Sequence, residues 1–296
     1  MQRWSGIAVA FLFVVASACG NSAAGQSTTI NVVAGENFWG SLAIQLGGAK
    51  VNVQSVVTDP NADPHEYESS ANDARAFAEA KLVILNGAGY DAWGQKLLDA
   101  NPASNRAVFT IAELLGKKEG DNPHFWYNPA YVVQVADKIT AEYKTIDASD
   151  ASYFDQKRSD FTKALQPYNS EIATIKQKYA GVPIGATESI FVYMATALGL
   201  NLTTPEEFMN AVAEGNDPPA DTVAAFQNQI SGNQIKVLVY NVQTSTSVTT
   251  NIKTLATAHH IANVGVSETL QPENLTFQDW QLKQLKGLEA ALSSSS

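Results

Sequence analysis

Short apolar runs alternate with amphipathic stretches along most of the chain. Apolar runs bounded by turn residues predict strands, whereas apolar residues repeating every three or four positions predict helices. Strands that alternate with helices favour parallel pairing, so the sequence predicts an α/β fold. The predicted strands are 30–34, 51–57, 82–85 and 107–111 in the first half, and 182–186, 235–240 and 262–267 in the second.

The helical pattern divides the chain into two α/β lobes. A long helical stretch from 151 to 179 separates the two sets of strands. Pro167 is expected either to kink or divide it or to open a second helical piece. We therefore expect two lobes with parallel-type sheets flanked by helices, joined by a long connecting helix: 29–148, 149–180 and 181–296. The other predicted helices are 38–46, 70–80, 90–100, 131–143, 188–198, 220–230, 248–260 and 277–292, with a loop over 210–219.

The N-terminus has the features of an export signal. Arg3 precedes an apolar run over 7–15 that is too short to cross a bilayer, and small residues lead into Cys19. Ala16-Ser17-Ala18-Cys19-Gly20 resembles the bacterial lipobox, in which the cysteine is lipidated, and Cys19 is the sole cysteine. We expect a signal peptide over 1–18, a lipid anchor at Cys19 and a flexible tether over 19–28. The alternative is a soluble exported protein cut near Ala18.

Composition narrows the classes of ligand. The net charge is −10, with 45% hydrophobic and 16% charged residues, which indicates a globular acidic protein. The chain has no basic run, so nucleic acid is not an expected partner. A cationic or metal ligand suits this charge better.

Two loops place a histidine directly after a proline. His65 follows Pro64 in a carboxylate-rich loop after a predicted strand, and Pro60 and Pro64 stiffen that loop. His124 follows Pro123 and precedes the aromatic run 125–127, which could wall a site from water or serve only as core. Both histidines are candidate ligands.

Two carboxylates follow predicted strands in the second half. Glu188 and Glu268 come after the strands 182–186 and 262–267, where parallel sheets gather ligands. Glu188 could equally be a first-turn glutamate favoured by the helix dipole. His259 and His260 end a helix, and we take both as structural.

Together these motifs resemble the metal-binding solute-binding lipoproteins of bacterial zinc and manganese ABC importers. The resemblance implies that one Mn²⁺ or Zn²⁺ per chain lies in the interlobe cleft as transported ligand, at positions matching His65, His124, Glu188 and Glu268. It also implies a membrane permease as partner, a monomer, no enzymatic activity, and an exported protein anchored to the outer face of the cytoplasmic membrane. The motifs that carry it are Asp63-Pro64-His65-Glu66-Tyr67-Glu68, Asn122-Pro123-His124-Phe125-Trp126-Tyr127-Asn128-Pro129, Ala186-Thr187-Glu188, Phe191-Val192-Tyr193 and Leu198-Gly199-Leu200.

The sequence departs from the family pattern at several positions. A glutamate as third ligand and the lack of a histidine-rich loop place the chain closer to the manganese-type branch. Glu268 stands where the family usually has aspartate. Asn122 and Asn128 stand where the family often has aspartate, so we do not expect a carboxylate to support His124. Some members of the family are also named adhesins. No residue pattern in this sequence supports an adhesive function.

The chemistry of the residues agrees with a transition metal. Two imidazoles and two carboxylates suit Mn²⁺, Fe²⁺ or Zn²⁺. Ligands from both halves imply that metal binding favours a closed state, which a permease could sense. The alternative is an exported metal-dependent hydrolase or non-haem iron enzyme, which would keep an open coordination position.

Overall fold

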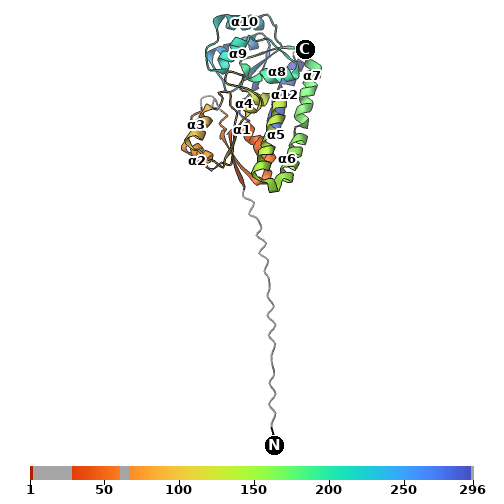
Figure 1. Cartoon of the computed structure of the whole chain (residues 1–296). Helices are drawn as coiled ribbons and strands as arrows, with labels where there is room; N and C mark the ends of the chain where they lie inside the picture. Colours follow the sequence, from red (N-terminus) through yellow and green to blue (C-terminus); the bar gives the residue numbers. More distant parts are fainter. Residues whose placement is uncertain (3–28, 61–66, 295–296) are drawn as a thin grey trace.

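Two parallel four-stranded sheets form the framework of the molecule. The computed structural model describes residues 1–2, 29–60 and 67–294 (Figure 1). The first sheet has the order β2-β1-β3-β4 and the second β6-β5-β7-β8, and every pair is parallel. The predicted α/β class is therefore confirmed. The strands are β1 (Ile30–Glu36), β2 (Val51–Val57), β3 (Leu82–Leu85), β4 (Ala107–Thr110), β5 (Pro183–Ala186), β6 (Asn201–Leu202), β7 (Val237–Asn241) and β8 (Ala262–Val266).

Helices cover both sheets, and most of them match the predicted segments. The predicted loop over 210–219 is wrong in its first part, because α9 continues to Ala213 before the chain turns at Gly215. The short strand β6 was also not predicted, since two residues carry no periodic signal. The helices besides the connector and the C-terminal helix are α1 (Asn37–Gly47), α2 (Ala71–Glu79), α3 (Ala92–Ala100), α4 (Ile111–Leu114), α5 (Pro129–Ile146), α8 (Val192–Leu198), α9 (Glu206–Ala213), α10 (Ala220–Ser231) and α11 (Ser247–Ala258), with short 3₁₀ turns η1 (Gly48–Lys50), η3 (Phe125–Tyr127), η4 (Ala148–Asp150) and η5 (Ser189–Phe191).

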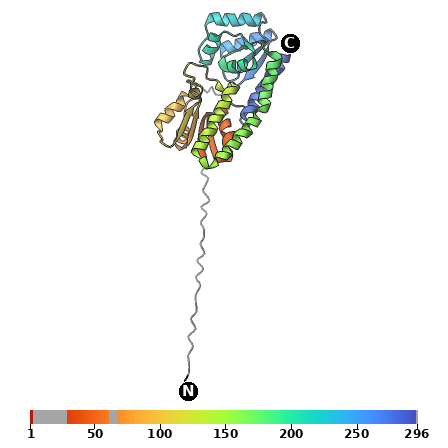
Figure 2. The ribbon, with the colours of Figure 1, turned by 45° about the vertical axis from the view of Figure 1, so that its right-hand side comes forward.

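A long bent helix connects the two halves. It consists of α6 (Ala151–Ala164) and α7 (Gln166–Tyr179), and it runs along one side of the molecule (Figures 1 and 2). Leu165 between them keeps helical dihedrals, and Pro167 lies in the first turn of α7, where its missing N–H costs no helical hydrogen bond. The helical stretch is therefore divided at Leu165, and Pro167 opens its second piece, which is one of the two predicted alternatives.

The C-terminal helix α12 (Phe277–Ser294) ties the second half back to the first. It packs along α7 and reaches α1, where the Phe277 amide donates to Ser41 Oγ at 3.0 Å. The side-chain amides of Gln45 and Gln278 also bond to each other, with N···O distances of 3.2 and 2.8 Å. Among residues 29–60 and 67–294, no helix has both the length and the apolar character needed to span a membrane.

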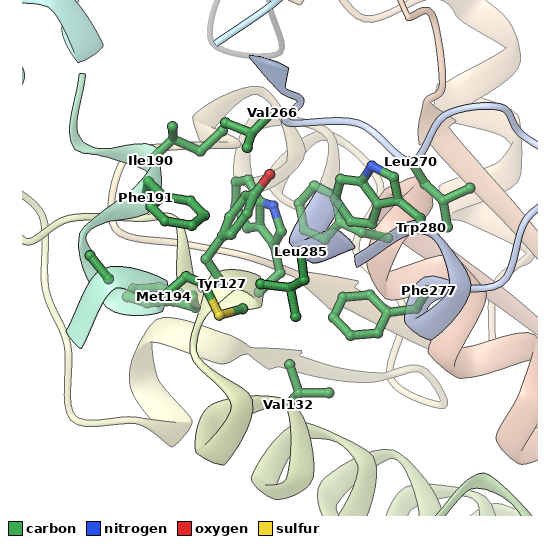
Figure 3. Packing of buried hydrophobic residues seen from close by; sticks show 14 of the residues in the cluster. Tyr127, Val132, Ile190, Phe191, Met194, Val266, Leu270, Phe277, Trp280 and Leu285 are labelled. Atoms are coloured by element: carbon green, nitrogen blue, oxygen red, sulfur yellow. The ribbon is translucent and has the colours of Figure 1, made fainter. Parts of the chain in front are cut away.

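The two halves share one hydrophobic core. Tyr127 of η3 lies between Phe191 and Met194 on one side and Trp280 and Leu285 of α12 on the other (Figure 3). The ring centroids of Tyr127 and Phe191 are 6.0 Å apart, and those of Tyr127 and Trp280 are 6.2 Å apart. Each fully buried large apolar side chain contributes about 1.5–3 kcal/mol, so this packing favours a fixed relation between the halves.

Candidate metal site

Three of the four predicted ligands lie together between the two sheets. One ligand atom from each of His124, Glu188 and Glu268 lies within 4.8 Å of the others, and all three side chains are buried. His65 and Cys19 fall in segments outside the described residues, so the structure does not place them. The assignment of the ligand set remains a prediction.

The ends of parallel strands bring the two carboxylates to one edge of the second sheet. Glu188 follows β5 and Glu268 follows β8, and β7 lies between these strands. Glu188 has extended dihedrals, φ −158° and ψ −177°, and η5 begins only at Ser189. The carboxylate of Glu188 makes no capping bond to that turn, so the first-turn interpretation is not supported.

Asn122 orients the imidazole of His124. Asn122 Oδ1 lies 2.8 Å from His124 Nδ1 and also accepts from the His124 backbone amide at 3.0 Å. An amide oxygen can only accept, so Nδ1 carries the proton and Nε2 is the ring nitrogen suited to a metal. The Asn122 Nδ2 donates to the Ser189 carbonyl at 2.7 Å, which links this loop to the second half. No carboxylate was expected to support His124, and the neutral amide of Asn122 orients its ring instead.

Aromatic rings surround His124. The Trp126 and Tyr90 ring centroids lie 5.2 and 6.2 Å from the His124 ring, and Phe38 stacks on Trp126 at 4.0 Å. These rings are nearly or fully buried, so they exclude water and strengthen electrostatic interactions at the site. The aromatic run therefore serves both expected purposes, because Tyr127 belongs to the shared core whereas Trp126 walls the site.

Tyr90 reaches the site from a tight loop of the first half. Its hydroxyl donates to Glu268 Oε2 at 2.6 Å. The loop is held by the Asp91 carboxylate, which accepts from the Asn86 and Gly87 amides at 2.6 and 2.8 Å. Gly87 has φ +76°, and a Cβ there would lie 2.3 Å from a Thr110 methyl, so only glycine fits. Tyr90 was not predicted as a site residue.

Asn241 joins the two carboxylates. It ends β7, is 2% exposed, and its Nδ2 lies 2.9 Å from Glu188 Oε1 and 2.7 Å from Glu268 Oε1. Asn241 was not predicted as a site residue. Its position at the end of a predicted strand, like the positions of Glu188 and Glu268, could have indicated it.

A further buried acid, Glu36, lies beside Asp91 and near Glu268. Glu36 ends β1, is fully buried, and has no hydrogen-bond donor among the described residues. Burial, and then the negative charge of Asp91, hold the pKa of Glu36 well above its ordinary value. Burial also raises the pKa of Asp91, but the Gly87 and Asn86 amides and the side chain of Glu36 stabilise its carboxylate, so the proton of this pair is favoured on Glu36.

A cavity of about 330 Å³ lies next to the site and is lined by both halves. Tyr90, Pro123 and Ser189 line it, each beside or bonded to one of the three clustered residues. Glu119, Asp121 and Glu214 add carboxylates to its wall. An acidic wall raises the local concentration of cations beside the site.

Other residues considered from the sequence lie elsewhere. His259 and His260 precede β8, so they lie at the opposite end of that strand from Glu268, and neither belongs to the cluster. Asn128 caps α5, because its Oδ1 accepts from the Ala130 and Tyr131 amides. Asn128 therefore has a capping role, whereas the structural role of the two histidines stays a prediction.

The fold and site define a two-lobed α/β protein with a buried candidate metal site. Comparison with known proteins gives a family of the same kind. A family described as "Zinc-uptake complex component A periplasmic" (ZnuA) matches residues 32–291. The chain belongs to this family.

Individual relatives and solved structures are similar to this chain in sequence or in fold. The chain is 28% identical over 221 residues to "Manganese ABC transporter substrate-binding lipoprotein PsaA" of Streptococcus mitis, covering 68% of this chain and 70% of PsaA. It is 26% identical over 210 residues to "Metal ABC transporter substrate-binding lipoprotein FimA" of Streptococcus parasanguinis, covering 65% and 67%. The Mn²⁺ complex of FpvC from Pseudomonas aeruginosa shares the fold, with a TM-score of 0.74 at 15% identity over 91% of this chain and 100% of FpvC. A structure of ZnuA matches with a TM-score of 0.68 at 22% identity, covering 90% and 98%.

The raised pKa of Glu36 predicts that the stability of the folded protein depends on pH. Glutamate in the unfolded chain titrates near 4.3. Because the pKa of Glu36 is raised in the folded state, its contribution to stability is complete below that pH and is lost as pH rises toward the folded pKa. Glu36→Gln cannot ionise, so the metal-free variant should melt higher than the wild type at pH 8 and almost equally at pH 4.

Thermal unfolding of chelator-treated protein at the two pH values checks this. Glu79→Gln, which removes an exposed carboxylate on α2, is the control and should show no such pH-dependent gain. A Glu36→Gln variant that melts below the wild type at pH 8 would show that Glu36 is held as a carboxylate.

Proposed function

We propose that this protein is the extracytoplasmic solute-binding component of an ABC importer and captures one divalent transition metal ion for a membrane permease. The observation that carries this function is the buried cluster of His124, Glu188 and Glu268 between two halves of a ZnuA-family fold. The relatives PsaA and FimA are named as substrate-binding lipoproteins of metal ABC transporters, which supports the same function here.

The donor set supports Mn²⁺ or Zn²⁺ as cargo. His124 supplies an imidazole nitrogen, Glu188 and Glu268 supply carboxylate oxygens, and His65 is proposed as the fourth ligand. This mixture of nitrogen and oxygen donors suits either ion. The intrinsic order of affinities places Zn²⁺ above Mn²⁺, so equilibrium affinity alone does not identify the transported metal.

Binding rather than catalysis is the better interpretation of the site. Four protein ligands would fill a tetrahedral site, whereas hydrolytic metal centres keep a position for water. The relatives that the chain matches are transport proteins, and this also favours solute binding over the hydrolase or iron-enzyme alternative.

Delivery to a permease requires the protein to stay near the membrane. We propose that Cys19 is lipidated and that residues 19–28 tether the folded part to the outer face of the cytoplasmic membrane. The lipobox-like sequence and the lipoprotein names of PsaA and FimA support this localisation.

Metal binding should depend on two of the four histidines. His65→Ala and His124→Ala should each weaken Zn²⁺ and Mn²⁺ binding, because each removes an imidazole ligand, while His259→Ala and His260→Ala serve as matched controls. A ligand at 100 times its dissociation constant adds about 2.7 kcal/mol of stability, so saturating metal should raise the wild-type melting temperature by several degrees.

Calorimetric titration and thermal melting of the four variants at pH 7.5 measure both effects. The first pair should lose most of the metal-induced shift, and the second pair should retain it. Equal losses at His259 would remove the assignment, and a wild type that binds neither metal would remove the proposed function.

The proposed anchor makes a separate prediction. Cys19→Ser in the full-length precursor, expressed in a bacterial host, should move the protein from the membrane fraction to the soluble exported fraction, because the thiol that accepts the lipid is gone. Fractionation and intact mass of the mature chain measure this. A variant that remains in the membrane fraction at its unprocessed mass would mean either that the uncut signal peptide serves as the anchor or that the lipobox assignment is wrong. A variant that is processed and membrane-bound like the wild type would contradict the assignment.

A further inference from the structure

Asn241 contacts both candidate carboxylate ligands at once. Its Nδ2 donates to Oε1 of Glu188 at 2.9 Å and to Oε1 of Glu268 at 2.7 Å, and Thr244 Oγ1 lies 2.9 Å away on the same nitrogen. The two glutamates are far apart in the sequence, but both accept a hydrogen bond from the side-chain amide of Asn241.

The orientation of the Asn241 amide is fixed by the loop that follows it. Asn241 Oδ1 accepts from the Gln243 backbone amide at 2.9 Å. An amide oxygen cannot donate and the NH₂ group cannot accept, so this bond turns Nδ2 toward the carboxylates. The 2% exposure of Asn241 keeps water from replacing these bonds.

Tyr90 completes the control of Glu268. Oε1 of Glu268 accepts from Asn241, and Oε2 accepts from the Tyr90 hydroxyl at 2.6 Å. Bonds to both oxygens fix the plane of this carboxylate. The plane of Glu188 is restrained by its Oε1 bond to Asn241.

We infer that Asn241 is a positioning residue that sets the metal preference of the site, an inference that rests on the proposed function. By holding one oxygen of each carboxylate, Asn241 limits how far Glu188 and Glu268 can rotate toward a bound ion. Zn²⁺ takes few ligands in a fixed tetrahedral geometry, so it gains from carboxylates that are already oriented. Mn²⁺ accepts more oxygen ligands in octahedral sites, so it tolerates carboxylates that turn to offer a second oxygen.

Substitution of Asn241 by leucine tests this inference. Asn241→Leu has a similar size but no donor. Asn263→Leu is the matched control, since Asn263 is an exposed residue of β8 whose side-chain amide donates to the Lys253 carbonyl and the Thr257 hydroxyl. Zn²⁺ affinity of Asn241→Leu should fall by about 10- to 100-fold, the usual effect of losing a residue that orients a metal ligand. Mn²⁺ affinity should fall much less, so the Zn²⁺-to-Mn²⁺ preference should shrink, while Asn263→Leu leaves both affinities unchanged.

Competitive titrations of both metals into the metal-free full chain at pH 7.5 provide the readout. Equal losses for the two metals would overturn the role in selectivity, and unchanged affinities would overturn the positioning role. If Asn241→Leu does not fold, Asn241→Ser, whose hydroxyl has a single proton for the two carboxylates, is expected to shift the preference in the same direction. A wild type that binds neither metal would instead overturn the proposed function.

Discussion

Two carboxylates buried against each other, beside an imidazole, set the main electrostatic constraint of this structure. Glu188 and Glu268 are each 1% exposed and share a site with His124. Moving an ion out of water costs several kcal/mol even after relaxation, and two like charges at this range add repulsion. Asn241 and Tyr90 offset part of this cost with neutral hydrogen bonds. A divalent cation would offset the remainder, which gives a physical reason for the site to bind one.

The constraint explains why the two halves are joined so closely. His124 and Tyr90 come from the first half and Glu188, Glu268 and Asn241 from the second, so the site keeps its geometry only while the halves keep their relation. The bent helix α6–α7, the return of α12 to α1 and the shared core around Tyr127 fix that relation. Asn37 adds to it, because its side chain bonds to both the N–H and the C=O of Leu270, two residues after Glu268. This packed interface is what a closed, metal-binding state requires.

The sequence predicted the framework well because the framework depends on local patterns. Strand and helix periodicity located both sheets, and strand ends located Glu188 and Glu268. Tyr90 and Asn241 were not predicted, since their bonds to Glu268 span 178 and 27 residues and depend on how the sheets are placed. Asn122 was regarded only as a departure from a family pattern, because the bond from its oxygen to His124 depends on the loop conformation.

Anomalous diffraction at the manganese edge, from crystals of the protein loaded with one equivalent of Mn²⁺, tests the central claim most directly. The account predicts one anomalous peak between the two sheets, within coordination distance of His124 Nε2 and of carboxylate oxygens of Glu188 and Glu268, with His65 completing the set. A single peak bound only by surface carboxylates, with the buried cluster unchanged, would contradict it.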